Sequence, residues 1–96
     1  MTMDRDAARD IAEQKLGTIY EQGGETLAID DAATREEDIG WVFYYQTKQY
    51  LERRDPDQQL IGNAPIVVDR DGNIYETGTG QPIEHYLDEI RARLGR

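Results

Sequence analysis

The pattern of apolar and polar positions predicts a helix at each end of the chain and strands between them. Residues 4–21 place apolar side chains at helical spacing on one face, with aspartates and arginines opposite. A second stripe runs over residues 82–94, where Pro82 suits a first helical turn and Gly95 ends the helix. The apolar positions of the two stripes are Ala8, Ile11, Ala12, Leu16, Ile19 and Tyr20, then Ile83, Tyr86, Leu87, Ile90 and Leu94.

The first part of the middle region has the β-branched and aromatic content of strands. One strand is predicted from Thr26 towards Arg35, followed by a turn over residues 36–40 and a second strand over residues 41–47. Residues 48–61 are polar and contain Pro56, so they are predicted to form a loop. Alternation along the second strand puts three aromatic residues on one face, Trp41, Phe43 and Tyr45, and three others on the opposite face, Val42, Tyr44 and Gln46.

Residues 62–80 fit either a calcium loop or a hairpin. Asp69, Asp71 and Asn73 stand at the first, third and fifth positions of a calcium loop. However, Ile74 replaces the glycine that the sharp turn needs, and Gly80 replaces the bidentate glutamate. The hairpin uses every residue, because an apolar run over 65–68 leads into Asp-Gly, which suits a tight turn. We therefore predict a third and a fourth strand here, and no metal site.

The order of these elements predicts an α+β fold of a single domain over residues 1–96. The expected architecture is a two-layer sandwich, in which the N- and C-terminal helices cover one face of a four-stranded, mainly antiparallel sheet. Trp41 and Phe43 would then form the core under the helices, while Gly62 and Pro65 would direct the chain into the third strand. The opposite face would be open, and it would present a candidate contact surface of Val42, Tyr44 and Gln46 with Tyr44 as its anchor.

The charge is negative and unevenly distributed. The net charge is −9, which argues against nucleic acid as a partner. Residues 25–40 carry six carboxylates against one arginine, a net −5. This segment is either a solvated face or a docking surface for a basic partner, with Glu36, Glu37 and Asp38 at a hairpin tip. A second candidate interface is the 48–61 loop around Arg53, Arg54 and Asp55.

The residue types argue against catalysis, a cofactor and a metal. The chain has no cysteine and no serine, and its one histidine is His85, beside Glu84 and Asp88. A catalytic imidazole needs a nucleophile or a fixed carboxylate, and charged neighbours on a helix are expected by chance. There is no apolar run of membrane-spanning length and no signal-peptide pattern at the start. We expect a non-enzymatic, cytoplasmic binding protein that does not engage a membrane.

Several sequence blocks stand at characteristic distances from one another. They are "GWVFYY" at residues 40–45, "YL" at 50–51, "LIGNAPIVVD" at 60–69, the Asp71-Gly72 and Gly78-Thr79 pairs, and "PIE" at 82–84 followed by "YL" at 86–87. Together these blocks resemble the immunity protein 35 family, also called YrhB-like, of bacterial polymorphic toxin systems. With the N-terminal helix, the resemblance covers nearly the whole chain.

The resemblance implies a function in toxin neutralisation. Members of this family are α+β domains encoded beside polymorphic toxins, so the implied activity is stoichiometric binding of a cognate toxin without catalytic residues. A toxin with a basic surface would suit the acidic segment. The alternative hypothesis is a small cytoplasmic chaperone or adaptor-like domain that binds a peptide or a client protein.

Overall fold

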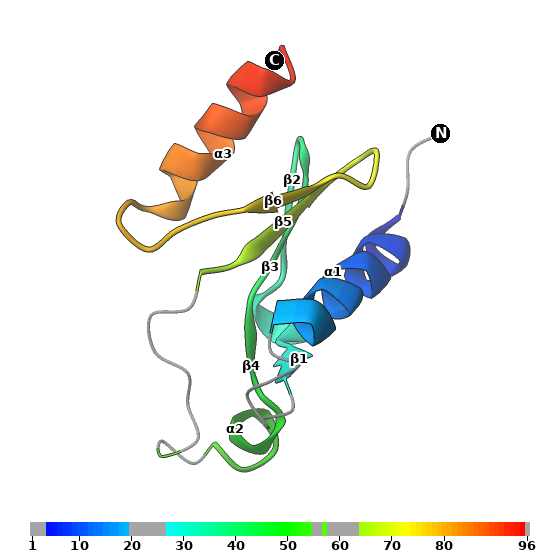
Figure 1. Cartoon of the computed structure of the whole chain (residues 1–96), viewed down its shortest axis with the longest axis vertical. Coiled ribbons are helices and arrows are strands. Elements are labelled where there is room, and N and C mark those ends of the chain that lie inside the picture. Colours follow the sequence, from blue (N-terminus) through cyan, green and yellow to red (C-terminus); the bar gives the residue numbers. More distant parts are fainter. Residues whose placement is uncertain (1–3, 20–26, 55–56, 58–63, 96) are drawn as a thin grey trace.

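The computed structural model describes residues 4–19, 27–54, 57 and 64–95 (Figure 1). These residues form an α+β fold with a long helix towards each end, as the sequence predicts. The elements in chain order are α1 (Arg5–Ile19), β1 (Leu27–Ile29), a 3₁₀ helix (Asp31–Ala33), β2 (Arg35–Glu37), β3 (Gly40–Phe43), β4 (Tyr45–Thr47), α2 (Lys48–Arg53), β5 (Ile66–Asp69), β6 (Ile74–Glu76) and α3 (Ile83–Arg93).

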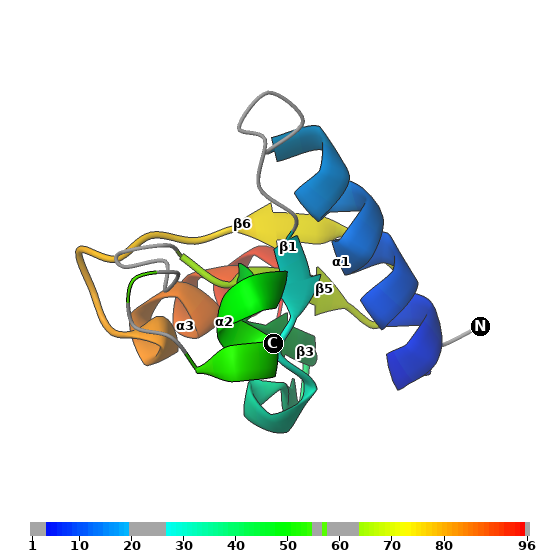
Figure 2. The same ribbon diagram turned by 90° about the horizontal axis from the view of Figure 1, so that it is seen from below.

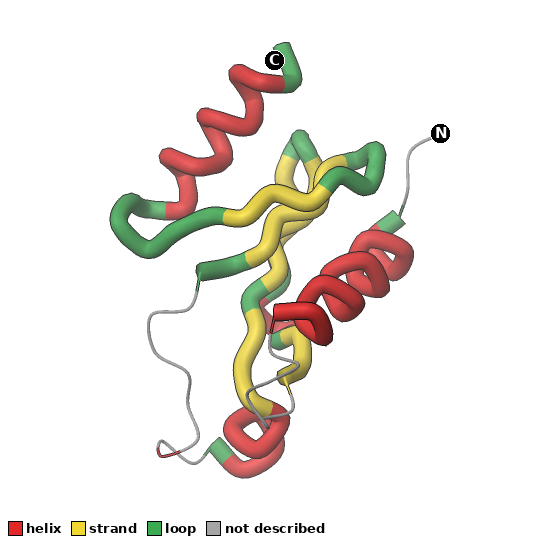
Figure 3. The backbone as a smooth tube through the Cα atoms, viewed as in Figure 1, coloured by secondary structure: helices red, strands yellow, loops and turns green. Residues whose placement is uncertain are grey.

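The strands form two antiparallel sheets rather than one (Figure 3). The larger sheet has the order β2-β3-β5-β6, and β1 pairs with β4 in a second, two-stranded sheet. Both of the long strands predicted from sequence are broken. The first is interrupted by the 3₁₀ helix, where Asp and Ala are poor strand formers. The second is interrupted at Tyr44, whose carbonyl accepts a hydrogen bond from the N–H of Asp30 at 2.8 Å.

The two long helices lie on opposite faces of the larger sheet, so the prediction that they share one face is wrong (Figure 2). Trp41 and Phe43 pack with α1, as predicted, whereas the intervening Val42 packs with Leu87 of α3. The reason lies in β3 and β5, which are buried at every position. Because successive side chains of a strand point to opposite faces, strands with apolar residues at successive positions, such as Trp41-Val42-Phe43 and Ile66-Val67-Val68, need cover on both faces.

The predicted loop over residues 48–61 begins with a short helix instead. Thr47 caps α2, since its Oγ1 accepts a hydrogen bond from the N–H of Tyr50 at 3.1 Å. The helix ends at Arg54, which adopts a left-handed conformation with φ of 56°. Gly62, predicted to direct the chain into the third strand, lies outside the described residues. Pro65 directly precedes β5, and its carbonyl accepts a hydrogen bond from the hydroxyl of Thr77 at 2.7 Å.

The boundaries of the long helices agree closely with the apolar stripes. Asp4 caps α1, because its Oδ1 accepts a hydrogen bond from the N–H of Ala7 at 2.9 Å. Pro82 stands immediately before α3, where its missing N–H costs nothing. The end of the first stripe at Tyr20 lies outside the described residues. No helix in the described ranges is both long and apolar enough to cross a lipid bilayer.

Candidate partner-binding surface

The predicted acidic hairpin is the β2–β3 unit, in which Glu37 pairs with Gly40 across the turn. Gly40 allows the hairpin to lie close against β5. A Cβ atom on Gly40 would lie 2.1 Å from the carbonyl oxygen of Val68, and the φ of Gly40 is +154°. Only glycine accommodates this approach without moving the backbone. Glu36 and Glu37 belong to β2, and Asp38 lies in the turn itself.

Arg70, from the turn after β5, joins this hairpin to the core. Its Nη1 lies 2.9 Å from Oε2 of Glu36, and its Nη2 donates a hydrogen bond to the carbonyl of Glu37 at 2.7 Å. The guanidinium also stacks 4.5 Å from the centre of the Trp41 ring. The guanidinium and the indole ring attract each other in a cation–π interaction. The position of the hairpin is therefore coupled to the buried side of β3.

Arg91 joins the same hairpin to α3. Its Nη2 lies 2.7 Å from Oδ1 of Asp38, and its Nη1 lies 2.8 Å from Oδ1 of Asp88 one turn earlier on the helix. The hydrogen bonds that Arg91 donates to Asp38 and, next in size, to Asp88 raise the pKa of Arg91 far above its usual value. In return, the hydrogen bond from Arg91 is the main cause that lowers the pKa of Asp38. Both groups are thus fully charged at neutral pH.

Arg35 completes the network. Its Nη2 lies 2.7 Å from Oε1 of Glu37, and its Nη1 lies 3.5 Å from Oε1 of Glu84 at the start of α3. The network contains five carboxylates and three guanidinium groups, a net charge of −2. More than half of each side chain is exposed at four of the carboxylates, which we call the acidic surface: Glu36, Asp38, Glu84 and Asp88.

The acidic surface differs from the one that the sequence predicted. Local counting over residues 25–40 gives −5, but Arg70 and Arg91 approach this hairpin from 34 and 53 residues away along the chain. No local sequence signal identifies these two arginines, because the contact depends on the register of β3 with β5 and on the placement of α3. The result is a moderately acidic surface held in place by guanidinium groups.

The second predicted contact set does not form a common exposed face. Val42 is completely buried beneath α3, so its assignment to an open face is wrong. Tyr44 is half-buried and packs against the same core, which also contradicts an exposed anchor. Gln46 is half-buried in the two-stranded sheet, opposite Ala28. Because helices cover both faces of the larger sheet, it has no open face of the kind on which this prediction depended.

The carboxylate of Asp69, the first position of the calcium-like pattern, is used by the hairpin turn. It is buried and accepts hydrogen bonds from the N–H groups of Asp71 and Asn73, both at 2.9 Å, and from the hydroxyl of Tyr75 at 2.9 Å. Burial, the largest influence, raises the pKa of Asp69, but the hydrogen bonds together lower it below its usual value. The hairpin between β5 and β6 is confirmed.

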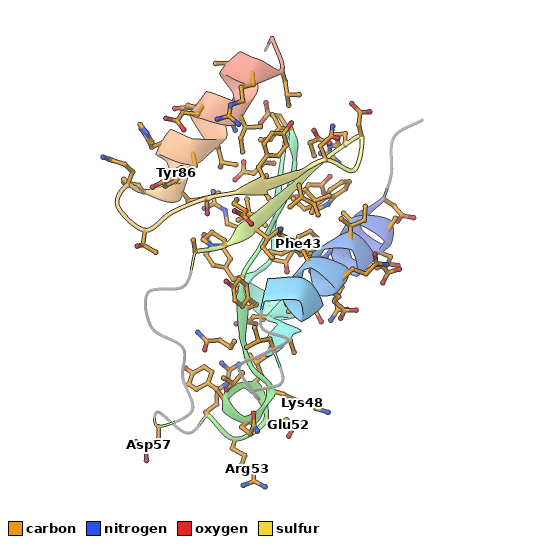
Figure 4. All side chains as sticks on the ribbon, viewed as in Figure 1. Phe43, Lys48, Glu52, Arg53, Asp57 and Tyr86 are labelled. Carbon is orange, nitrogen blue, oxygen red and sulfur yellow. The ribbon has the colours of Figure 1, made fainter. Side chains whose placement is uncertain are left out.

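The remaining candidate residues are divided between α3 and the end of α2. His85 is on the exposed side of α3, where its Nε2 lies 3.1 Å from Oε1 of Glu89. Arg53 and Arg54 are at the end of α2, at the opposite end of the molecule from α3 (Figure 4). The guanidinium of Arg54 stacks on Tyr50 at 5.4 Å from the ring centre. Asp55 lies outside the described residues. In the described ranges, no group of three or more metal-ligating side chains comes together.

The fold defines a small α+β domain whose sheet lies between two helices, and sequence comparison identifies its family. The family described as Immunity protein 35 matches residues 6–89. The chain therefore belongs to the immunity protein 35 family. "Uncharacterized protein YrhB" of Escherichia coli (strain K12) is 41% identical over 55 residues, which are 56% of this chain and 58% of that protein. The match thus spans less than two thirds of that relative. No solved structure matches the chain significantly.

Proposed function

We propose that this chain is an immunity protein that neutralises a cognate bacterial toxin in the cytoplasm by direct binding, without catalysis. The observation that carries this proposal is the family match over residues 6–89, which includes α1 almost completely, the whole larger sheet and the first seven residues of α3. The name of that family describes immunity. An inhibitor that acts by binding needs a rigid complementary surface rather than a catalytic set.

The acidic surface is the part of the molecule that we assign to the toxin. Toxins that cleave nucleic acid need basic clefts, and an acidic partner both fills such a cleft and speeds the encounter. Arg70 and Arg91 hold Glu36 and Asp38 in fixed positions before binding. Side chains that are already ordered lose less entropy when the complex forms, so their arrangement favours affinity.

Coexpression with the toxin encoded beside this chain's gene tests the proposal. We expect the chain to restore growth of cells that produce the toxin and to copurify with it in a fixed stoichiometry. An immunity protein from another family is the control, and it should do neither. If cells that make both proteins still die and no complex forms, the proposal is wrong. If the chain instead prevents the aggregation of unfolded client proteins and does not bind the toxin, the result would favour the chaperone-like alternative.

A further inference from the structure

The outer edge of β6 has the features of a docking site for an extended peptide. β6 is the last strand of the larger sheet, and no strand in the described part of the chain pairs with its outer edge. It also carries Ile74, 38% exposed, which is the exposed large apolar residue of the described ranges. An uncovered strand edge presents main-chain donors and acceptors to any extended chain that approaches it.

The register of the hairpin identifies which groups point outwards. The N–H of Asp69 donates to the carbonyl of Asn73 at 2.9 Å, so these two residues form a hydrogen-bonded pair. In an antiparallel ladder such pairs alternate with non-bonded pairs. Val67 and Tyr75 therefore bond to each other, while the N–H and C=O groups of Ile74 and Glu76 point away from β5. The edge offers two donors and two acceptors.

The two long helices form walls beside this edge. A hollow of about 350 Å³ runs along β6, lined by Lys15 of α1, by all three residues of β6, and by Tyr86, Glu89, Ile90 and Arg93 of α3. A second hollow of about 130 Å³ also reaches Glu76 and continues towards Tyr45 and Ile66. Figure 4 shows Tyr86 on the part of α3 near the loop that joins it to β6. The strand edge is thus the floor of a cleft with apolar and polar walls.

The charges of the cleft indicate what kind of segment fits it. Lys15 Nζ lies 3.2 Å from Oε1 of Glu76, and Glu89 is paired with His85. Arg93 forms no ion pair or hydrogen bond with the described residues. Ile74 lies opposite Val68 and therefore points to the α1 face of the sheet, whereas Arg93 is on α3, which covers the other face. Because successive side chains of a strand point to opposite faces, Ile74 and Arg93 are placed to contact neighbouring residues of an added strand.

We propose that the β6 edge binds an extended segment of the toxin, which adds a strand to the sheet and carries an acidic residue next to an apolar one. The main chain of the segment bonds to Ile74 and Glu76, its acidic side chain pairs with Arg93, and its apolar side chain covers Ile74. This inference rests on the proposed function and adds a contact beyond the acidic surface.

The other free edge of the sheet and a second copy of this chain fit the observations less well. β2 presents Arg35, Glu36 and Glu37, and charged side chains of this kind protect an edge against strand addition. A second copy would bring its own α1 and α3 alongside its β6, so helix would meet helix at both walls of the cleft. A single extended segment needs no such space.

Two substitutions at Glu76 separate main-chain pairing from charge. Glu76→Pro removes the outward N–H and puts ring atoms in its place. The hydrogen bonds between β6 and β5 stay intact, because they do not use the N–H of this residue. Glu76→Gln removes the same charge and the pair with Lys15 but keeps the N–H. With the toxin encoded beside this chain's gene as the probe, we expect Glu76→Pro to weaken binding at least about tenfold and Glu76→Gln less than about threefold.

Three further measurements keep the test decisive. Circular dichroism should show that both variants remain folded. Amide hydrogen exchange in the wild-type complex should slow at Ile74 and Glu76, and Arg93→Gln should weaken binding. If the wild-type chain binds the toxin but Glu76→Pro binds as tightly as Glu76→Gln, or the two amides exchange as in the free protein, this inference is wrong while the proposed function stands. If the wild-type chain does not bind, the proposed function fails first.

Discussion

The two faces of the larger sheet are covered in different ways. On the α1 face, two small residues of the helix, Ala8 and Ala12, are fully buried against a core that contains Trp41 and Phe43. On the α3 face, the buried core consists of aliphatic side chains, and the margin is closed by ion pairs between arginines and carboxylates. Small residues allow α1 to approach the sheet closely, and the aromatic rings fill the space around them. The α1 face is therefore mainly a packed scaffold, while the α3 face combines packing with charge that a partner can meet.

This contrast predicts that the largest loss of stability comes from the aromatic core on the α1 face. Trp41 is 2% exposed, and Trp41→Ala should lower the free energy of unfolding by about 3–5 kcal/mol. Because Trp41 is the only tryptophan, unfolding should be followed by circular dichroism in denaturant rather than by fluorescence. Trp41→Phe is the control and should cost clearly less. A loss below about 1 kcal/mol for the alanine variant would contradict the burial of the ring.

Removal of an aliphatic side chain from the α3 face should have the next largest effect. Leu87 is almost completely buried between α3 and the sheet. Leu87→Ala should lower the free energy of unfolding by about 2–4 kcal/mol, since it creates a cavity that the neighbouring valines cannot fill. The same denaturant titration measures it. If Leu87→Ala costs more than Trp41→Ala, the contrast between the two cores is reversed.

The buried carboxylate of Asp69 should give a smaller effect that depends on pH. Asp69→Ala removes the acceptor of several hydrogen bonds and should cost about 1–3 kcal/mol at pH 7. The folded-state pKa of Asp69 lies below its unfolded value of about 3.9. Its contribution is therefore present above the unfolded pKa and is lost as the pH falls through the folded pKa. In denaturant titrations of both proteins from pH 7 to pH 2, the difference in stability should shrink as the pH falls below the unfolded pKa, and a constant difference would contradict this role.

The ion pairs at the edge of α3 should contribute least to stability. Asp38 and Asp88 are more than half exposed, and surface ion pairs contribute between 0 and about 1 kcal/mol. Arg91→Gln should therefore lower the free energy of unfolding far less than Leu87→Ala does, and this difference should shrink further in high salt. A loss comparable with that of Leu87→Ala would show that the network, and not the apolar core, holds α3 in place.

The features that follow from local periodicity could be predicted from the sequence, and those that depend on distant contacts could not. Alternation correctly put Trp41 and Phe43 together on a buried face, which α1 alone covers, and the apolar stripe correctly gave α3. The cover over Val42 was missed because a lone strand does not show whether its second face has a helix available. α2 was missed because six residues carry too little periodicity to distinguish a helix from a polar loop.

The candidate site shows the same division. Glu36, Glu37 and Asp38 do form an acidic hairpin, but their electrostatic environment is set by Arg70 and Arg91, which reach it only through the tertiary fold. Counting charges along the chain therefore overestimated the local negative charge. The cleft at β6 was not predicted either, because its two walls come from opposite ends of the sequence.

A matched pair of charge-neutralising variants tests whether the toxin meets the α3 side of the molecule. One variant removes three negative charges from the acidic surface by Glu36→Gln, Asp38→Asn and Asp88→Asn. The other removes the same number of charges from exposed positions of α1 by Asp6→Asn, Asp10→Asn and Glu13→Gln. Both variants have the same net charge, so only the place of the missing charges differs between them.

The measurement is the association rate constant with the toxin at several ionic strengths. The acidic-surface variant should associate about tenfold more slowly at low salt and should show a weaker salt dependence, because charges near an interface act mainly on the encounter rate. The α1 variant should remain close to the wild type. If the two variants slow association equally, the attraction depends only on net charge, and the assignment of the toxin to the α3 side is wrong.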